Sequence, residues 1–142
     1  RMALQSIAIQ ATANLQLIAR GSGQIVANAN FAELAASLAT FDLPVVVDAG
    51  CGVVSPELLA RASSSLLITR PCYLSLRRAA QLNVVPTGVV LINEPGRALG
   101  KRDVESVIGA PVIAEITFDG IFIIVPAFTP SFNIGLISSI FS

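Results

Sequence analysis

The chain has 142 residues and a mass of 14.8 kDa, which is the size of one domain, and we expect residues 1–142 to form a single unit. Hydrophobic residues make up 54% of the chain and charged residues only 13%, a composition that excludes intrinsic disorder. The 9 basic and 9 acidic residues cancel, so no overall field recruits nucleic acid, and we expect no such partner. The chain has no histidine, which removes the commonest general base and the commonest metal ligand.

The two cysteines, Cys51 and Cys72, match neither a disulfide framework nor a zinc-binding spacing, and they indicate a reducing compartment. The start of the sequence lacks the charged region and the compact apolar region of a signal peptide. A nucleophilic cysteine would need a base, and no histidine is present to serve as one. We therefore expect a cytoplasmic protein with two small, half-buried thiols.

Short apolar runs alternate with helical patterns along the chain. Asn14–Ala19 is typical of a strand, and the apolar residues after Asn30 recur at the spacing of one helix face. Asn30 is suited to cap that helix, with Glu33 completing a start that resembles a capping box. Pro44–Ala49 is a β-branched run that predicts another strand.

The same alternation continues through the second half of the chain. Ser55 and Pro56 are typical of a helix start, since Ser caps the first turn and Pro is tolerated there. Gly109 is expected to end a helix. The predicted strands are Ser65–Thr69, Gly88–Ile92, Pro111–Ile116 and Ile121–Val125, and the predicted helices begin at Ser55 and cover Tyr73–Leu82 and Asp103–Ile108.

This order of elements predicts an α/β fold. Strands that are apolar on both faces and alternate with helices indicate a mostly parallel sheet of about five or six strands, with helices on both faces. In open sheets of this kind, ligands bind where the strands end at their carboxyl edge. The candidate loops are Asp48–Ser55, Thr69–Cys72 and Asn93–Gly100.

The segment Phe41–Gly52 carries the clearest chemical signal. It is an apolar strand that ends in Asp48, with Gly52 shortly after it. A carboxylate at the tip of a buried parallel strand is placed to hold Mg²⁺ through water, and a glycine lets the backbone approach a phosphate. The competing interpretation is that Asp48 caps the next loop by accepting backbone N–H bonds.

Together with the segments that follow it, this strand resembles the Walker B strand and switch of the deviant P-loop ATPases of the ParA/MinD family. The resemblance covers Phe41–Asp119, a little over half of the chain, and Asn93 matches the family's adenine-contacting Asn. It implies a P-loop NTPase-like core, Mg-ATP as the cofactor, and dimer formation. The other segments that carry it are Thr69-Arg70-Pro71, Ser75-Leu76-Arg77, Gly88–Asn93 and Gly109–Asp119.

The phosphate-binding half of the family's site has no counterpart here, so the resemblance is to a truncated P-loop core. No Walker A sequence occurs in residues 1–41, the sole lysine is Lys101, and Thr117 replaces the family's usual Pro. Without the N–H cradle of that loop and its lysine, phosphates have no tight seat. We therefore predict no catalytic residue and no bound cofactor.

The nucleotide-site residues keep two interpretations. If an upstream segment or a partner chain supplies the missing loop, the chain is a fragment of a Mg-ATP-binding ATPase. Asp48 then organises Mg²⁺ through water, Gly52 approaches the phosphate and Asn93 reads adenine. Otherwise Asp48 caps its loop, Gly52 serves turn geometry and Asn93 is a turn residue.

The segment Gly120–Ser142 carries no charge. Its prolines and polar residues disfavour a membrane span, so we interpret it as two short buried strands or as an oligomer interface. The leading hypothesis is a non-catalytic ParA/MinD-like interaction or assembly module, a homodimer built partly on this tail. A small-ligand binder at the strand ends is a further alternative.

Overall fold

The computed structural model describes residues 2–19, 30–51, 54–82, 84–117, 122–124 and 134–140, and these form an α/β arrangement, as the sequence predicts. The helices are α1 (Met2–Ser6), α2 (Phe31–Leu38), α3 (Pro56–Arg61), α4 (Tyr73–Ala79) and α5 (Lys101–Ile108). The strands are β1 (Ile9–Thr12), β2 (Leu15–Leu17), β3 (Val45–Asp48), β4 (Ser64–Thr69), β5 (Gly88–Asn93), β6 (Val112–Thr117), β7 (Phe122–Ile124) and β8 (Ile134–Ile140).

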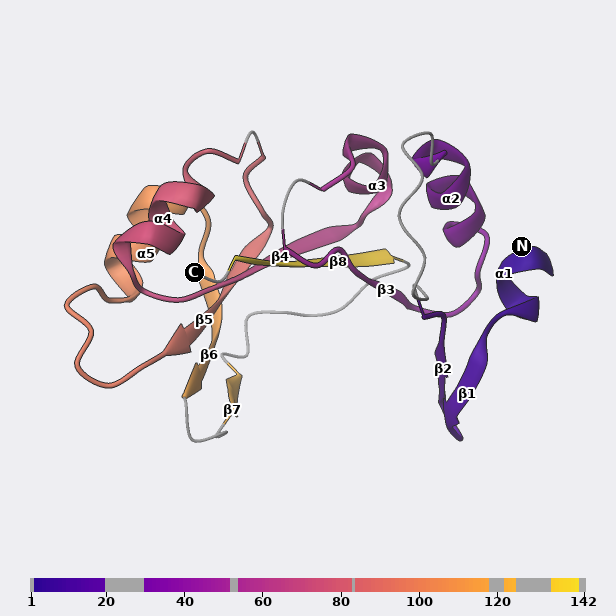
Figure 1. Ribbon diagram of the computed structural model, residues 1–142, viewed down its shortest axis with the longest axis horizontal. Coiled ribbons are helices and arrows are strands. Elements are labelled where there is room, and N and C mark those ends of the chain that lie inside the picture. Colours follow the sequence, from indigo (N-terminus) through magenta and orange to yellow (C-terminus); the bar gives the residue numbers. More distant parts are fainter. Residues whose placement is uncertain are drawn as a thin grey trace.

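The main sheet has the strand order β3-β8-β4-β5-β6-β7 (Figure 1). The pairs from β3 through β6 are parallel, and β7 runs antiparallel to β6 at one edge. The uncharged segment Gly120–Ser142 supplies both β7 and β8, and its interpretation as short strands is confirmed for residues 122–124 and 134–140. Because β8 lies inside a parallel sheet, a sequence without charges suits its position. The rest of this tail lies outside the described residues.

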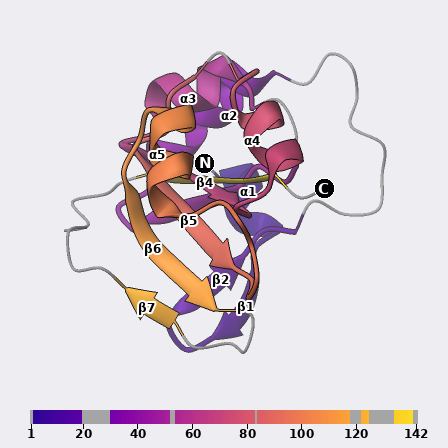
Figure 2. The ribbon, with the colours of Figure 1, turned by 90° about the vertical axis from the view of Figure 1, so that its left-hand side faces the viewer.

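Helices α2, α3, α4 and α5 all lie on the same side of the main sheet (Figures 1 and 2). The expectation of helices on both faces is therefore wrong for the residues that the structure describes. The reason is the direction of the connections. Helices α3, α4 and α5 join β3 to β4, β4 to β5 and β5 to β6, and each connection advances toward the same edge. Right-handed crossovers that advance in one direction place their helices on one face.

A separate antiparallel pair, β1 and β2, lies outside the main sheet. The predicted strand at Asn14–Ala19 is shortened to β2, because residues 13–14 form the turn that joins it to β1. Gln10 and Gln16 lie opposite each other in this pair, and their side chains are hydrogen bonded at 3.2 Å. The pair is too small to bury its own apolar residues, and Ile9 and Leu17 remain 59% and 54% exposed.

The helix ends confirm the local predictions. The Asn30 side chain accepts the Glu33 backbone N–H at 3.0 Å and caps α2. Ser55 caps α3, with Pro56 in its first turn. Gly109 ends α5 with φ +75°, a left-handed conformation that suits glycine.

Two apolar clusters hold the helices against the sheet. The larger one joins α4 and α5 to strands β4, β5 and β6, and the smaller one joins α2 and α3 near β3. The larger cluster consists of Leu67, Leu76, Ala79, Val89, Leu91, Val104, Ile108, Ala110 and Val112. The smaller one consists of Ala35, Leu38 and Leu58. Strands β4 and β5 both contribute to the larger cluster, and two of the polar loops described next follow these strands.

Candidate functional site

The loops that follow β3, β4 and β5 hold the residues for which the sequence predicts a site. These strands are parallel, so their carboxyl ends point the same way, and this edge is where α/β sheets bind ligands. The structure describes all of the loops after β4 and β5, and it describes the loop after β3 except for residues 52–53. Gly52 therefore lies outside the described residues.

Asp48 ends β3 with an exposed side chain. One of its carboxylate oxygens accepts the backbone N–H of Gly50 at 2.8 Å, and Gly50 adopts φ +67°. This is the arrangement in which a strand-end Asp caps the loop after it. Asp48 thus holds its own turn, which is one of the two interpretations predicted for it.

Asn93 ends β5 and is half-buried. Its side-chain amide donates a hydrogen bond to the carboxylate of Glu115 on the neighbouring strand β6. Thr117 pairs with Asn93 in the strand register. The Asn93 amide is therefore engaged within the sheet rather than in a turn.

The structure does not bring Asp48 and Asn93 side by side. In the register of the sheet, Asp48 is level with Ile137 and Leu66, and hence with Gly88 at the start of β5. Asn93 lies at the far end of β5, and two further strands separate β5 from β3. From the usual strand spacing and rise, the two residues are roughly 20 Å apart.

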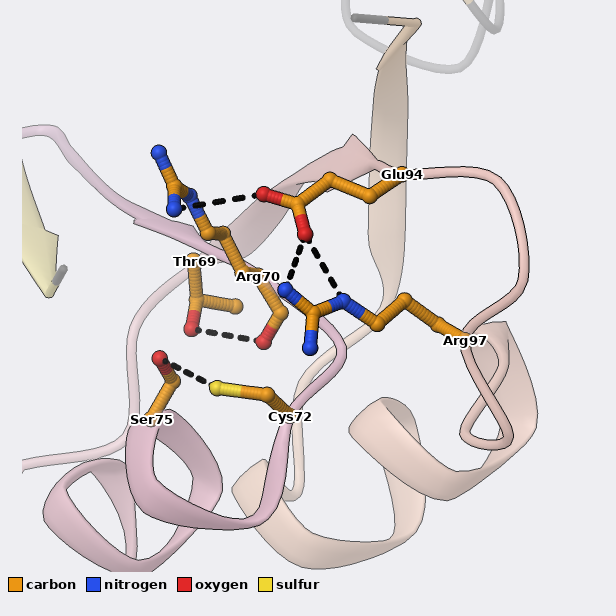
Figure 3. A network of polar contacts seen from close by, with 6 residues as sticks. All are labelled: Thr69, Arg70, Cys72, Ser75, Glu94 and Arg97. Atoms are coloured by element: carbon orange, nitrogen blue, oxygen red, sulfur yellow. Dashed lines mark hydrogen bonds and ion pairs between the residues drawn. The ribbon is translucent and has the colours of Figure 1, made fainter. Parts of the chain in front are cut away.

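Between the ends of β4 and β5 the structure forms a network of charged side chains (Figure 3). Glu94 pairs with two arginines: its Oε1 lies 3.2 Å from Arg70 Nη1, and its Oε2 accepts hydrogen bonds from Nε and Nη2 of Arg97. The side chain of Glu94 is only 15% exposed, whereas those of Arg70 and Arg97 are 32% and 44% exposed. One carboxylate therefore lies between two guanidinium groups.

Glu94 and Arg97 lie in the predicted candidate loop Asn93–Gly100, but their contact was not predicted, although the sequence carries a signal for it. Glu94-Pro95-Gly96-Arg97 has Pro and Gly in the order typical of a type II turn, and Gly96 adopts φ +80°. Such a turn brings its first and fourth residues together, so Arg97 returns onto Glu94. Arg70 reaches the same carboxylate from the end of β4, a contact that no local pattern predicts.

The thiols occupy different environments near this edge. Cys51 is exposed, so the expectation that it is half-buried is wrong, because the turn at Gly50 carries it away from the core. Cys72 is partly buried, as expected, and its thiol donates a hydrogen bond to the Ser75 hydroxyl at 3.1 Å (Figure 3). Across the part of the chain that the structure describes, no three His, Cys, Asp or Glu side chains gather as a metal site.

Lys101, the sole lysine of the chain, begins α5, and its ammonium lies 3.9 Å from the Glu105 carboxylate within the same helix. In the described ranges no helix has the length and apolar character needed to cross a membrane. Comparisons with protein-family models, with curated proteins and with solved structures each find no match for this chain.

Proposed function

We propose that this chain is a ParA/MinD-like, P-loop-derived domain that acts as a non-catalytic interaction or assembly module and associates with a second copy of itself. The observation that carries the proposal is the face of the main sheet opposite helices α2 to α5. In the described residues this face has no helix over it, and its central strands present apolar side chains.

The strand alternation identifies this face. Leu67, Val89 and Leu91 are buried in the cluster with α4 and α5, so their neighbours along β4 and β5 point the other way. The register aligns these neighbours with alternate residues of β6. The resulting apolar face consists of Leu66, Ile68, Val90, Ile92, Ala114 and Ile116, all of intermediate exposure. Apolar faces of this extent that water still reaches are typical of interaction sites.

The polar side chains at the carboxyl edge favour an activity without turnover. Asp48 bonds its own loop, and Asn93 bonds Glu115. The separation of roughly 20 Å between Asp48 and Asn93 is larger than one compact nucleotide site would use. Two of the three residues that the nucleotide interpretation requires, Asp48 and Asn93, thus make a side-chain contact within the fold.

The resemblance itself is supported by the order of the elements. The segment that ends in Asp48 is a strand, Ser75-Leu76-Arg77 lies in the following α4, and Gly88–Asn93 is the strand after it. This is the succession in which the ParA/MinD-like segments occur in the sequence. The strand order agrees with a parallel core, which a P-loop-derived domain would have.

Light scattering coupled to size exclusion tests the self-association. We expect a dimer at tens of micromolar that Ile68→Glu dissociates, because a carboxylate on the apolar face would lose its hydration in the interface. Val107→Glu is the matched control, since Val107 is 45% exposed on α5, on the helix side of the sheet. Circular dichroism verifies that both variants fold. A monomer at tens of micromolar for the wild type would contradict the proposal.

A second measurement tests the absence of turnover. We expect the wild type to show no magnesium-dependent hydrolysis of ATP. We also expect it to show no magnesium-dependent binding of ATP that depends on the Asp48 side chain, so Asp48→Ala should behave like the wild type in both measurements. Micromolar binding that requires both Mg²⁺ and Asp48 would instead establish the Mg-ATP-binding interpretation.

A further inference from the structure

The hairpin of β1 and β2 has one apolar face, most of which the described residues leave uncovered. Ile9 lies opposite Leu17 in the register, and Leu15 is two residues before Leu17, so these three side chains share one face. Ile9, Leu15 and Leu17 are 59%, 57% and 54% exposed. Gln10 and Gln16 lie on the opposite face, where their side chains are hydrogen bonded to each other. The hairpin is therefore amphipathic, and its apolar face is in water.

A hairpin of this kind needs a covering surface. Two strands alone are marginally stable, and a third strand or a packed face is required to hold them. The chain anchors the base of the hairpin, because Leu4 of α1 packs against the smaller apolar cluster of α2 and α3. Residues 2–19, which include the hairpin, carry no charged side chain that would favour contact with water. These features indicate that another surface covers the apolar face of the hairpin when the protein acts.

The hairpin extends away from the main sheet on the side opposite helices α2 to α5 (Figures 1 and 2). This is the side on which the apolar face of the sheet lies. Val46 of β3 also points there, since its neighbours Val45 and Val47 pack against the α2–α3 cluster, and it is 66% exposed. Two sheets packed face to face lie about 10 Å apart, whereas a strand of 4 residues such as β1 is roughly 13 Å long. In a dimer joined through the sheet faces, the hairpin of one copy is therefore long enough to reach the sheet of the other.

The exposed areas favour a second copy of the chain as the covering surface. A leucine or isoleucine exposes roughly 160 Å² in an unfolded chain, so the three apolar hairpin residues and the neighbouring Ile7, which is 57% exposed, present roughly 350 Å². The six residues of the apolar sheet face are of intermediate exposure and present no more than roughly 300 Å². A stable dimer buries about 800 Å² per partner, which neither surface supplies alone. With Val46 included, the two surfaces together approach this area.

We propose that the β1–β2 hairpin is a dimerisation arm whose apolar face packs against the main sheet of a second copy, on the side opposite helices α2 to α5. Two-fold symmetry makes the contact reciprocal, so each copy gives its arm and receives the arm of its partner. The proposal rests on the self-association proposed above, and it adds the segment that brings the interface to the size of a stable one.

The dissociation constant of the dimer, measured by sedimentation velocity over a dilution series, tests the arm. Leu17→Ser should raise it by about tenfold or more, because each dimer loses the contact twice. Gln16→Ser is the matched control on the other face of the same strand, and it should leave the constant within about twofold of the wild type. Since Gln16→Ser also removes the Gln10–Gln16 hydrogen bond, a loss caused by loosening of the hairpin would appear in both variants. Circular dichroism verifies that both variants fold.

Cross-linking locates the contact. A photoreactive benzoylphenylalanine placed at Leu15 in a mixture of ¹⁴N- and ¹⁵N-labelled chains should give cross-links between copies that map to strands β3 to β6. Cross-links confined to one copy would overturn the proposal, because the hairpin would then be covered by its own chain.

The remaining outcomes separate this proposal from the self-association on which it rests. A monomeric wild type contradicts both. A dimer that Ile68→Glu dissociates and Leu17→Ser leaves unchanged overturns the arm alone. If Leu17→Ser leaves the dimer unchanged and lowers co-sedimentation with phosphatidylcholine–phosphatidylserine vesicles, the hairpin binds lipid and the arm is likewise overturned.

Discussion

Asn93 and Glu115 lie on adjacent parallel strands, and the Asn93 amide donates a hydrogen bond to the Glu115 carboxylate across the β5–β6 pair. Both side chains are half-buried, so each would lose part of its hydration without the other. This pair is a polar contact at the end of the sheet between strands β5 and β6, which are separated in the sequence by helix α5.

The first prediction concerns the stability that this pair supplies. Glu115→Ala should lower the free energy of unfolding by about 1.5–3 kcal/mol, because it removes a charged acceptor and leaves the Asn93 amide without it. Urea denaturation followed by circular dichroism measures the change. Glu115→Gln is the control, since its amide oxygen still accepts the bond and the loss should be smaller. Equal losses for both variants would show that the contact contributes little.

The second prediction concerns the close approach of Gly88 and Ile113. A Cβ on Gly88 would lie 3.0 Å from two side-chain atoms of Ile113, where the register of β5 and β6 shifts. Gly88→Ala should therefore destabilise the fold by about 1–3 kcal/mol through overpacking. The double variant with Ile113→Ala should lose less stability than the sum of the losses of the two single variants, since the second change removes the atoms that clash. Strict additivity in thermal unfolding would argue against the contact.

The third prediction concerns the end of α5. Gly109 has φ +75°, so Gly109→Ala should cost about 1 kcal/mol, because a Cβ disfavours the left-handed conformation. Gly109→Asn should cost less, since Asn tolerates this conformation better than Ala. Chemical denaturation of the three proteins ranks their stabilities, and Ala ranking above Asn would contradict the assigned cap geometry.

The fourth prediction concerns pH. The hydrogen bond from the Ser55 hydroxyl, with a smaller contribution from its own backbone N–H, lowers the pKa of Glu57 from its ordinary value of 4.5. A carboxyl whose pKa is lower in the folded state stabilises the fold above its unfolded pKa, and this contribution is lost as the pH falls through the folded pKa. Ser55→Ala should raise the pKa of Glu57 back toward 4.5, measurable by following its carboxyl carbon in nuclear magnetic resonance. An unchanged pKa would show that Ser55 is not the cause.

Much of the local structure could be predicted because its causes lie within a few residues. The Asn30 cap, the Ser55-Pro56 start and the Gly109 end each depend on neighbouring backbone groups, and each is present in the structure. The predicted helix at Tyr73–Leu82 ends earlier, at Ala79, and β1 was not predicted at all. Short, exposed elements such as β1 carry little hydrophobic periodicity, so the pattern that predicts longer elements is absent there.

The candidate site was less predictable, since its contacts join distant segments. Asp48 as a loop cap was one of two interpretations, whereas the Asn93–Glu115 bond and the Arg70–Glu94 pair were not foreseen. Nothing near Arg70 in the chain indicates that the residue after β5 supplies its partner. Only the pairing of β4 with β5 brings the two side chains together.

The sequence by itself determined the element types and the apolar character of the strands, because helix caps, turn residues and alternation act locally. The tertiary structure alone decided that β8 lies between β3 and β4, that α2 to α5 share one side of the sheet, and that Asp48 and Asn93 lie far apart. Strand order depends on pairings between residues as distant in the chain as Asp48 and Ile137, and these carry no local signature. The apolar composition of the chain therefore has a structural counterpart in the apolar sheet face opposite α2 to α5, which no described helix covers and which only the direction of the crossovers reveals.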